Sequence, residues 1–336
     1  MSQETYRWLA TNVLAGFAET RRPWWANAAE SEGHLLNLFN EEVPMDRVEQ
    51  LLTSWSPREE ALYTGDMKPV TTHKLIVASD NNEHMAVVGA DYAIHSYQAW
   101  LTGTVKEVVG DDARISSAGL LRNRAQAWVQ IERPETAVGP DGILFSPYVS
   151  LSTSLDYSLP SQINQNTRMI ICDNTLEIGR GQGLAFRAKH TKNSGAKLGD
   201  YRSVMAAIMA GESDFRAELE RQLATEVPDA AFDRFINAFI PINDDDKPAK
   251  KTRSERKRQE ITQLYKSDHR VASWKGTEFG VVQAVNTWNQ HLSQLRNATG
   301  YELDDTNLRA MRNYAQSLRG NQGADMETAK VLESVL

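Results

Sequence analysis

The chain has 336 residues, of which 41% are hydrophobic and 24% charged, and its formal net charge is −7. An apolar share close to that of globular proteins excludes disorder along the whole chain, and the single cysteine, Cys172, excludes an internal disulfide framework and a multi-cysteine metal site. The negative net charge argues against uniform electrostatic wrapping of nucleic acid. The N-terminus lacks the basic and apolar pattern of a secretory signal, and no apolar run approaches the roughly 18 residues that span a bilayer. We therefore expect a cytoplasmic protein with no membrane association.

Residues 1–66 are expected to form a helical N-terminal segment. A first apolar stripe recurs at helical spacing and ends at Arg21-Arg22-Pro23, because proline disfavours helix in the residue before it. This stripe consists of Trp8, Leu9, Val13, Leu14 and Phe17. A second helix is predicted to open at Val43-Pro44-Met45-Asp46, with Val48, Leu51, Leu52 and Trp55 on one face.

Residues 67–200 are expected to form an α+β sheet core. Two apolar runs flank Asp80-Asn81-Asn82, which indicates a hairpin because Asp and Asn tolerate left-handed turn conformations. A helix is predicted over about 96–109, followed by strands over 126–131, 143–155 and 168–172, the first of which alternates with the period of a half-buried strand. This order of elements predicts an antiparallel sheet packed with helices.

The remainder is expected to be mostly helical. Residues 201–246 form a helical extension, with one stripe at Val204, Met205, Ile208 and Met209 and another at Phe232, Phe235, Ile236 and Phe239. Residues 247–260 are either a basic linker or the exposed start of a helix. Residues 261–336 form a C-terminal helical part, in which the apolar stripe is Val281, Val285, Trp288, Leu292 and Leu295.

Several sequence blocks resemble the phage/plasmid-like protein family built on domain of unknown function 932. The blocks begin with Trp8-Leu9, Gly16-Phe17, Arg21–Trp25 and Val43–Asp46, continue with Val88–Tyr92, Trp100-Leu101, Ala118–Leu121 and Ala127–Val129, and end with Cys172–Leu176, Lys189–Thr191, Gly276–Val285 and Trp288–His291. Where many members carry Ser-His-Asp-Gly-Ser, this chain has Ser154-Leu155-Asp156-Tyr157-Ser158. The missing histidine argues against catalysis at that position. The resemblance implies a phage or plasmid origin and no particular activity.

Positive charge is concentrated in two regions, 168–202 and 247–258, whereas residues 1–66 are rich in acids. Clustered cations are what phosphate binding requires, although either region is also consistent with a solvated surface. The candidate nucleic-acid-binding residues are Arg168, Arg180, Arg187, Lys189, His190, Lys192, Lys197, Arg202, Lys250, Lys251, Arg253, Arg256, Lys257 and Arg258. Tyr201 and Tyr265 lie nearby and are candidates for stacking on bases.

Two shorter motifs have a structural and a functional interpretation. Gly179-Arg180-Gly181-Gln182-Gly183 is either a flexible connection or a loop that lets backbone N–H groups approach a phosphate, although it lacks the Walker lysine. Cys172-Asp173-Asn174-Thr175 lies where a strand is predicted to end, so Asn174 or Thr175 is expected to cap a following helix rather than contact a ligand.

No catalytic or metal-binding constellation is evident. The seven histidines form no His-x3-His pair and there is no Gly-x-Ser-x-Gly elbow. Asp244-Asp245-Asp246 has the carboxylates that a magnesium ion prefers, but adjacent acids beside a proline are more typical of a solvated turn. We therefore expect no catalytic residue, no metal and no cofactor.

The preferred hypothesis is a non-catalytic DNA-metabolism protein that binds single-stranded DNA, possibly anneals complementary strands and forms a homo-oligomer. The order of sheet and helices is similar to that of ring-forming annealing proteins, which is an analogy at the level of the fold alone. Two alternatives stay open. The first is a protein–protein interaction factor, host-modulating or anti-defence, that binds no DNA; the second is a metal-dependent nuclease that uses Asp244 to Asp246.

Overall fold

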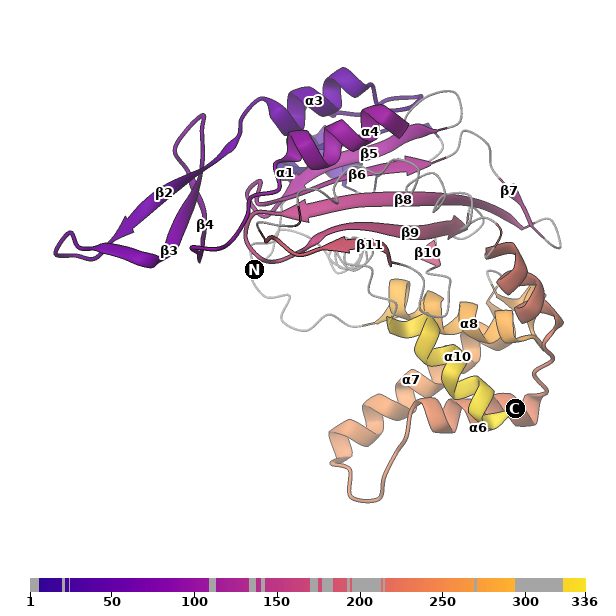
Figure 1. Ribbon diagram of the computed structural model, residues 1–336. Helices are drawn as coiled ribbons and strands as arrows, with labels where there is room; N and C mark the ends of the chain where they lie inside the picture. Colours follow the sequence, from indigo (N-terminus) through magenta and orange to yellow (C-terminus); the bar gives the residue numbers. More distant parts are fainter. Residues whose placement is uncertain are drawn as a thin grey trace. The chain divides into compact units, whose positions relative to one another are not determined.

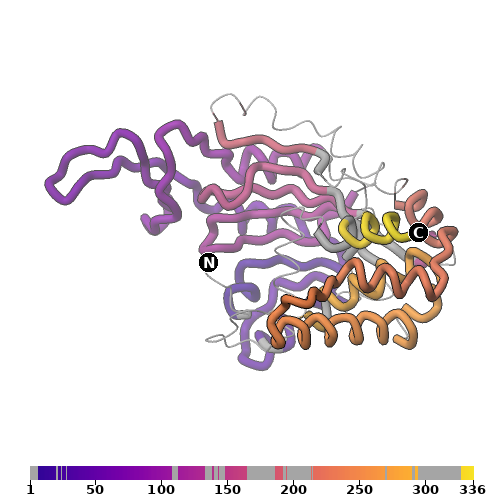
Figure 2. The backbone as a smooth tube through the Cα atoms, turned by 90° about the horizontal axis from the view of Figure 1, so that it is seen from below, coloured from indigo at the N-terminus to yellow at the C-terminus, as the bar shows by residue number. Residues whose placement is uncertain are grey.

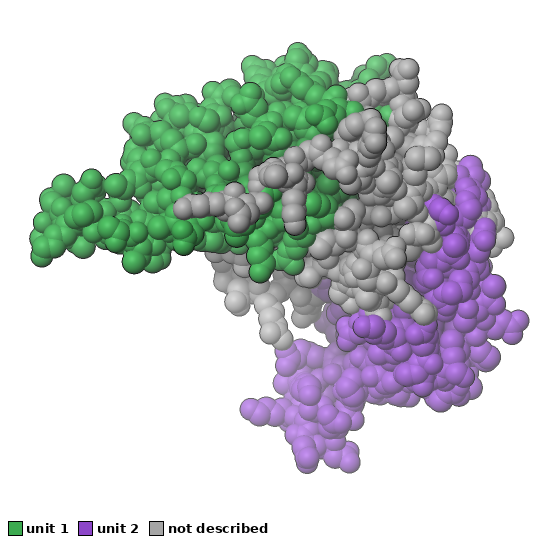
Figure 3. Space-filling model, viewed as in Figure 1, with its two compact units in different colours: residues 1–135, 147–165, 184–209 green, residues 136–146, 166–183, 210–336 purple. Residues whose placement is uncertain are grey.

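The computed structural model describes most of the chain as two compact units, shown separately in Figure 3. The described residues are 6–19, 22–23, 25–108, 113–132, 137–139, 143–169, 175–176, 184–191, 194, 213, 215–268, 271–293 and 323–336. Unit 1 consists of residues 1–135, 147–165 and 184–209, and unit 2 of residues 136–146, 166–183 and 210–336. Antiparallel sheets precede a helical C-terminal part, so the expected α+β class is confirmed.

An antiparallel sheet forms the centre of the fold and follows the order β1-β5-β6-β8-β9-β10, with β7 paired to β8 and β11 to β9. Its strands are β1 (Val13–Ala15), β5 (Arg114–Leu121), β6 (Gln126–Glu132), β7 (Ala137–Val138), β8 (Leu144–Ser154), β9 (Ser161–Met169), β10 (Thr175–Leu176) and β11 (Leu184–Ala188). Figure 1 shows the long strands side by side with helices over one face. The helices of unit 1 are α1 (Tyr6–Asn12), α2 (Ala26–Ser31), α3 (Met45–Thr53), the π-helix η1 (Gln98–Thr102) and α4 (Gly103–Val108).

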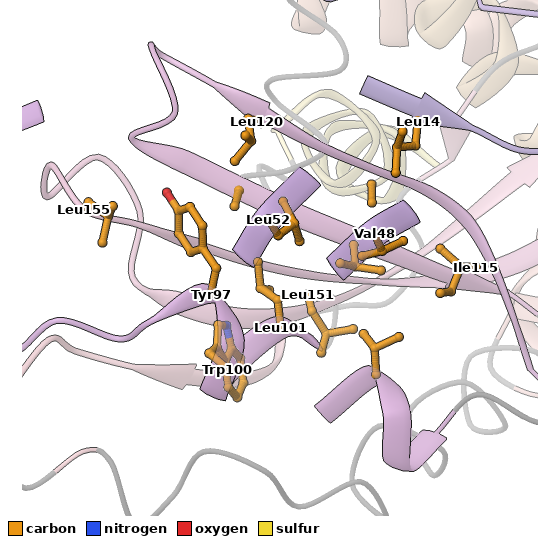
Figure 4. Close-up of a cluster of buried hydrophobic side chains, with 14 of the residues drawn as sticks. Leu14, Val48, Leu52, Tyr97, Trp100, Leu101, Ile115, Leu120, Leu151 and Leu155 are labelled. Atoms are coloured by element: carbon orange, nitrogen blue, oxygen red, sulfur yellow. The ribbon is translucent and has the colours of Figure 1, made fainter. Parts of the chain in front are cut away.

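One face of the sheet and the covering helices enclose the main hydrophobic core (Figure 4). Leu52 of α3 and Trp100 of η1 are both at most 1% exposed and pack with Leu120, Val129 and Leu151 from the strands. Alternation along β6 directs every second side chain to this core. Burial of these large side chains contributes about 1.5–3 kcal/mol each to folding.

The opposite face of the same strands carries mainly uncharged polar side chains. Cross-strand register places Gln126, Trp128, Gln130 and Glu132 of β6 opposite Ser154, Ser152, Ser150 and Tyr148 of β8. All are buried. The Trp128 indole lies over Gly119 of β5, its cross-strand partner, so closely that a Cβ on residue 119 would overlap the six-membered ring.

Three further strands of unit 1 form a separate antiparallel sheet in the order β2-β3-β4, referred to below as the arm. It comprises β2 (Pro57–Tyr63), β3 (Pro69–Ala78) and β4 (His84–Gly89). Figures 1 and 2 show it extending away from the main sheet. Its base is anchored because Ile76, Ala78 and Val88 are buried in the main core.

Unit 2 contains helices packed around their own apolar clusters. They include α6 (Asp229–Phe239), α7 (Pro248–Ser267), the 3₁₀ helix η4 (Ala272–Trp274), α8 (Glu278–Thr287), the π-helix η5 (Trp288–Leu292) and α10 (Gly323–Val335). Phe232 and Phe235 of α6, Tyr265 of α7, Val281 of α8 and Leu332 of α10 share one cluster. A second cluster joins Phe215 and Leu219 to Trp274 and Phe279.

Several expected boundaries differ from the structure. The first helix ends at Asn12, because Val13–Ala15 pairs with β5 as strand β1. The segment 1–66 is not wholly helical: Pro57–Tyr63 is a strand, and the boundary after residue 66 falls in the β2–β3 turn. Neither are the expected domains 201–246, 247–260 and 261–336 separate, since residues 210–336 all belong to unit 2. The alternative of an exposed helix start at 247–260 is confirmed by α7, which begins at Pro248.

Candidate functional site

The first half of α7 is the most strongly basic described segment. Its buried side chains, Ile261, Leu264 and Tyr265, all lie in the last two turns, so residues 248–260 have no buried side chain. Proline at the first helical position suits this start, since its missing N–H has no partner in a first turn. The α7 arm, as we call residues 248–260, therefore contributes no fully buried side chain to a core.

Two of its six cations hold the helix in place. The Arg258 guanidinium donates to the carbonyl oxygen of Ile240 from Nε at 2.9 Å and from Nη2 at 2.6 Å. The Lys257 Nζ lies 4.4 Å from the Trp288 ring centroid and 5.0 Å from that of Phe239, a cation–π arrangement. Burial lowers the pKa of Lys257. Both side chains are engaged by contacts within unit 2, and their binding of phosphate stays a prediction.

The other four cations of the α7 arm are directed to solvent or to weak local partners. The Lys250 Nζ lies 2.5 Å from Asp246 Oδ1, and Arg256 Nε lies 2.7 Å from Glu260 Oε1. Lys251 donates to the carbonyl of Asp244 at 2.8 Å, and Arg253 donates to the carbonyl of Ala249 at 3.1 Å. The Lys250 and Arg256 side chains are 53% and 64% exposed in these pairs, so both cations are accessible to a phosphate.

The acidic turn before α7 is occupied by contacts within the protein. Asp246 accepts from the backbone N–H of Asn243 at 3.0 Å and pairs with Lys250, and both contacts lower its pKa. Within the described residues, no group of three or more His, Cys, Asp or Glu side chains is arranged to hold a metal ion. Asp246 therefore stabilises the turn before α7.

His190 lies in a stack of rings in unit 1. Its imidazole is 4.7 Å from the Tyr92 ring centroid and 4.3 Å from that of His95, and its Nδ1 lies 3.1 Å from the Ala93 carbonyl. Burial lowers the pKa of His190, which the carbonyls of Ala93 and Leu159 partly oppose. Stacking and burial favour the neutral imidazole, and the binding of nucleic acid by His190 stays a prediction.

His95 extends this stack into a chain of hydroxyl groups. Its Nδ1 lies 2.7 Å from Ser161 Oγ, and its Nε2 lies 2.7 Å from Ser194 Oγ. Ser194 also lies 2.5 Å from the carbonyl of Thr191 and must donate there, which leaves its oxygen to accept from His95 Nε2–H. A histidine that donates to a serine cannot take its proton, so this arrangement holds Ser194 in place and does not activate it.

The remaining predicted residues divide into three groups. Arg187 and Lys189 are exposed in unit 1, at and just after β11. The backbone of Arg168 pairs with Thr175 in β9 and β10, which also shows that the predicted helix cap at Thr175 is wrong. Outside the described residues lie Arg180, Lys192, Lys197, Arg202, Asn174, Tyr201 and the glycine-rich segment 179–183.

The comparison with protein families agrees with the block resemblance. The model of the family described as "Domain of unknown function (DUF932)" matches residues 84–314, well over half of the chain. The chain belongs to this family. The match in this DUF932 protein covers the ring stack, most of the sheet and the α7 arm. No curated protein and no solved structure gives a significant match.

The DUF932 segment Ser154–Ser158 closes the β8–β9 turn. Asp156 accepts from the backbone N–H of Ser158 at 3.0 Å and pairs with Arg122 at 2.8 Å. Tyr157 has φ = 62°, in the left-handed region that glycine adopts without strain. Its hydroxyl accepts from the Gly89 N–H at 2.7 Å, which ties the turn to β4.

This geometry makes opposite predictions for two substitutions at Tyr157. Tyr157→Ala loses the bond to Gly89 and keeps the backbone strain, and is expected to lower the free energy of unfolding by about 1–2 kcal/mol. Tyr157→Gly loses the same bond but relieves the strain, so its loss should be smaller by about 1 kcal/mol. Urea titration of both variants measures the difference; a glycine variant as unstable as the alanine variant would contradict the strain.

Sequence reasoning missed the network at the β5–β6 turn. Arg122, Asn123 and Arg124 all have φ between 52° and 68°. The Arg124 guanidinium donates to Asp80 Oδ2 at 2.9 Å and lies 4.6 Å from the Trp55 ring centroid. Such contacts join residues far apart in the sequence, and no local pattern signals them.

No helix in the described part of the chain is long and apolar enough to cross a membrane.

Proposed function

We propose that this DUF932 protein is a non-catalytic DNA-metabolism protein of phage or plasmid origin that binds single-stranded DNA, with annealing of complementary strands as the reaction that this binding serves. The observation that supports it is the α7 arm, a helical segment with four outward cations and no buried side chain. An element that contributes nothing to a core and concentrates one sign of charge is typical of a contact with a polyanion.

The α7 arm favours recognition of phosphates over recognition of bases. Lys250 and Arg253 are three residues apart and therefore share one side of the helix, and Arg256 follows at the same step. The nearby aromatic candidate, Tyr265, is buried and stacks on Phe232 with ring centroids 4.1 Å apart, so it cannot stack on a base. Binding through backbone charge predicts weak sequence preference and strong dependence on salt.

The test is fluorescence anisotropy with a labelled single strand over a range of salt concentrations. Each phosphate contact with a single strand contributes about 0.7 to the slope of log K against log salt. A variant with Lys250, Lys251, Arg253 and Arg256 all changed to glutamine is therefore expected to bind at least tenfold more weakly and to lower that slope by about 3. A double variant of Arg187 and Lys189 tests the exposed cations of unit 1 separately.

A matched control removes the same charge elsewhere. Lys68, Lys106, Arg114 and Lys275 are exposed to similar degrees and lie outside the α7 arm. The fourfold glutamine variant of these residues should retain most of the affinity for DNA. An equal loss of affinity would assign binding to the total charge of the protein and reject the α7 arm as the binding surface. Absence of any salt-sensitive binding by the wild-type protein rejects DNA binding altogether and favours the protein-interaction alternative. Annealing is measured separately, as the rate at which two labelled complementary strands pair.

A further inference from the structure

The outer part of the arm formed by β2, β3 and β4 has no core of its own. None of the seven residues of β2 is buried, and the first buried residue of β3 is Ile76, the eighth of its ten. Three of the eight exposed large hydrophobic residues in the described part of the chain lie on it: Tyr63, Met67 and Val87. A ribbon of this kind is marginally stable in water unless another surface packs against it, so its exposed apolar side chains point to a partner.

The two free edges of the arm differ in charge. In the described residues β2 and β4 are the outer strands of the three. The β2 edge carries Arg58, Glu59 and Glu60, and charged residues on an edge oppose pairing with another chain. The β4 edge runs through Met85, Ala86, Val87 and Val88 without Asp, Glu, Lys, Arg or Pro. The edge that is open to pairing is therefore β4.

β4 is also held in a fixed position. Val88 is fully buried in the core of unit 1, and Tyr157 accepts from the N–H of Gly89 at the end of the strand. Val87, directly before these two anchors, is 54% exposed. A strand that is already ordered loses little conformational entropy when it pairs.

We propose that β4 is a self-association edge, at which the β4 strands of two copies of this chain pair antiparallel and join their arms into one six-stranded sheet. The charges on the arm favour a second copy over a nucleic acid, because its acids and bases compensate each other. Lys74 pairs with Glu59 at 2.6 Å, Arg58 with Glu60 at 2.7 Å and Lys68 with Asp66 at 2.7 Å. When the β4 edges of two copies pair, no like charges are brought side by side. A polyanion is a less suitable partner, because the arm has no net positive charge to attract it.

The test is the mass of the full chain in solution, measured by light scattering after size-exclusion chromatography over a range of concentrations. The wild-type protein is expected to form a dimer or a multiple of it, and Val87→Lys should reduce the mass at least by half. Leu35→Lys is the control, because Leu35 is 90% exposed in unit 1 and lies outside the arm. The circular dichroism spectrum of each variant shows whether it is folded.

Cross-linking tests the edge directly, even if Val87→Lys should impair folding. Cys172 is the only cysteine, so Val87→Cys in a Cys172→Ser background provides a single thiol. Oxidation is expected to yield a covalent dimer from Val87→Cys and none from Glu59→Cys, on the charged edge. A wild-type protein that is monomeric at all concentrations, or a mass that Val87→Lys leaves unchanged, would overturn the proposal. Neither result depends on whether the chain binds DNA.

Discussion

Gly119→Ala is expected to lower the free energy of unfolding by about 3 kcal/mol, the upper end of the usual cost of overpacking. Residue 119 pairs with Trp128 across β5 and β6, and the indole rests on the glycine backbone. An added Cβ would overlap the six-membered ring, and Trp128 is fully buried, so the ring has little room to move. Either the ring or the strand must shift, and both shifts disturb the centre of the sheet.

The control is Gly65→Ala, where a Cβ would have no neighbour within 4 Å. That substitution should be nearly neutral or slightly stabilising, because it only restricts the unfolded chain. Urea unfolding followed by tryptophan fluorescence and by circular dichroism measures both free energies. If Gly119→Ala were as stable as Gly65→Ala, the close packing of Trp128 on β5 would be disproved.

A double-mutant cycle identifies the cause of the loss. Trp128→Phe removes the part of the indole that meets the added Cβ, and by itself it should destabilise the protein by leaving a cavity. In that background Gly119→Ala should cost at least 1 kcal/mol less than in the wild-type protein, since the overlapping atoms are gone. Equal costs in the two backgrounds would place the strain elsewhere, for example in the loss of backbone freedom.

Elements with a clear period could be predicted from the sequence. The alternation at 126–131 corresponds to β6, and the apolar runs around Asp80–Asn82 correspond to β3 and β4. The stripe at Phe232 and Phe235 corresponds to α6. In each case the side-chain period marks an apolar face that packs into a core. The expectation that β6 is half-buried is wrong, because its polar face is buried as well.

The missed strands show where local pattern fails. Val13–Ala15 continues the apolar stripe of the preceding helix, and only its pairing with Gly119, more than a hundred residues away, makes it a strand. Pro57–Tyr63 is charged and exposed, with no apolar period, and it is a strand because it hydrogen-bonds to β3. Such strands depend on a partner that lies elsewhere in the sequence.

The positive charge of the candidate site could be predicted from the sequence, but the orientation of each cationic side chain could not. The sequence shows six cations between Lys250 and Arg258, yet tertiary contacts decide which of them face solvent. Arg258 faces inward because it donates to the carbonyl group of Ile240, directly after α6. Lys257 faces inward because its amine contacts the rings of Phe239 and Trp288. The position of His190 among lysines and arginines in the chain gives no sign that its ring stacks on Tyr92.

Acid is expected to destabilise unit 1 through the ring stack before it protonates most carboxylates. Burial lowers the pKa of His95 to about 4, helped by the neighbouring His190, and burial also lowers the pKa of His190. A histidine in the unfolded chain has a pKa near 6.5. Below that pH the unfolded chain therefore binds more protons than the folded chain does. The stabilisation from His95 is complete above pH 6.5 and is lost as the pH falls toward 4, by about 1.4 kcal/mol per pH unit. The lowered pKa of His190 contributes a loss in the same direction.

The free energy of unfolding at pH 7 and at pH 5, from urea titrations, measures this loss. His190→Phe keeps a ring between Tyr92 and His95 but cannot take a proton, so it should be less stable at pH 7, where the bond to Ala93 is missing, and should lose less stability on acidification. His73→Asn, on an exposed strand residue, is the control and should show the wild-type pH dependence. A buried imidazole that resists protonation makes the unfolded chain the better acceptor of protons, so removing that imidazole must reduce the loss of stability in acid. Identical losses in the wild-type protein and in His190→Phe would therefore mean that the stack does not govern acid stability.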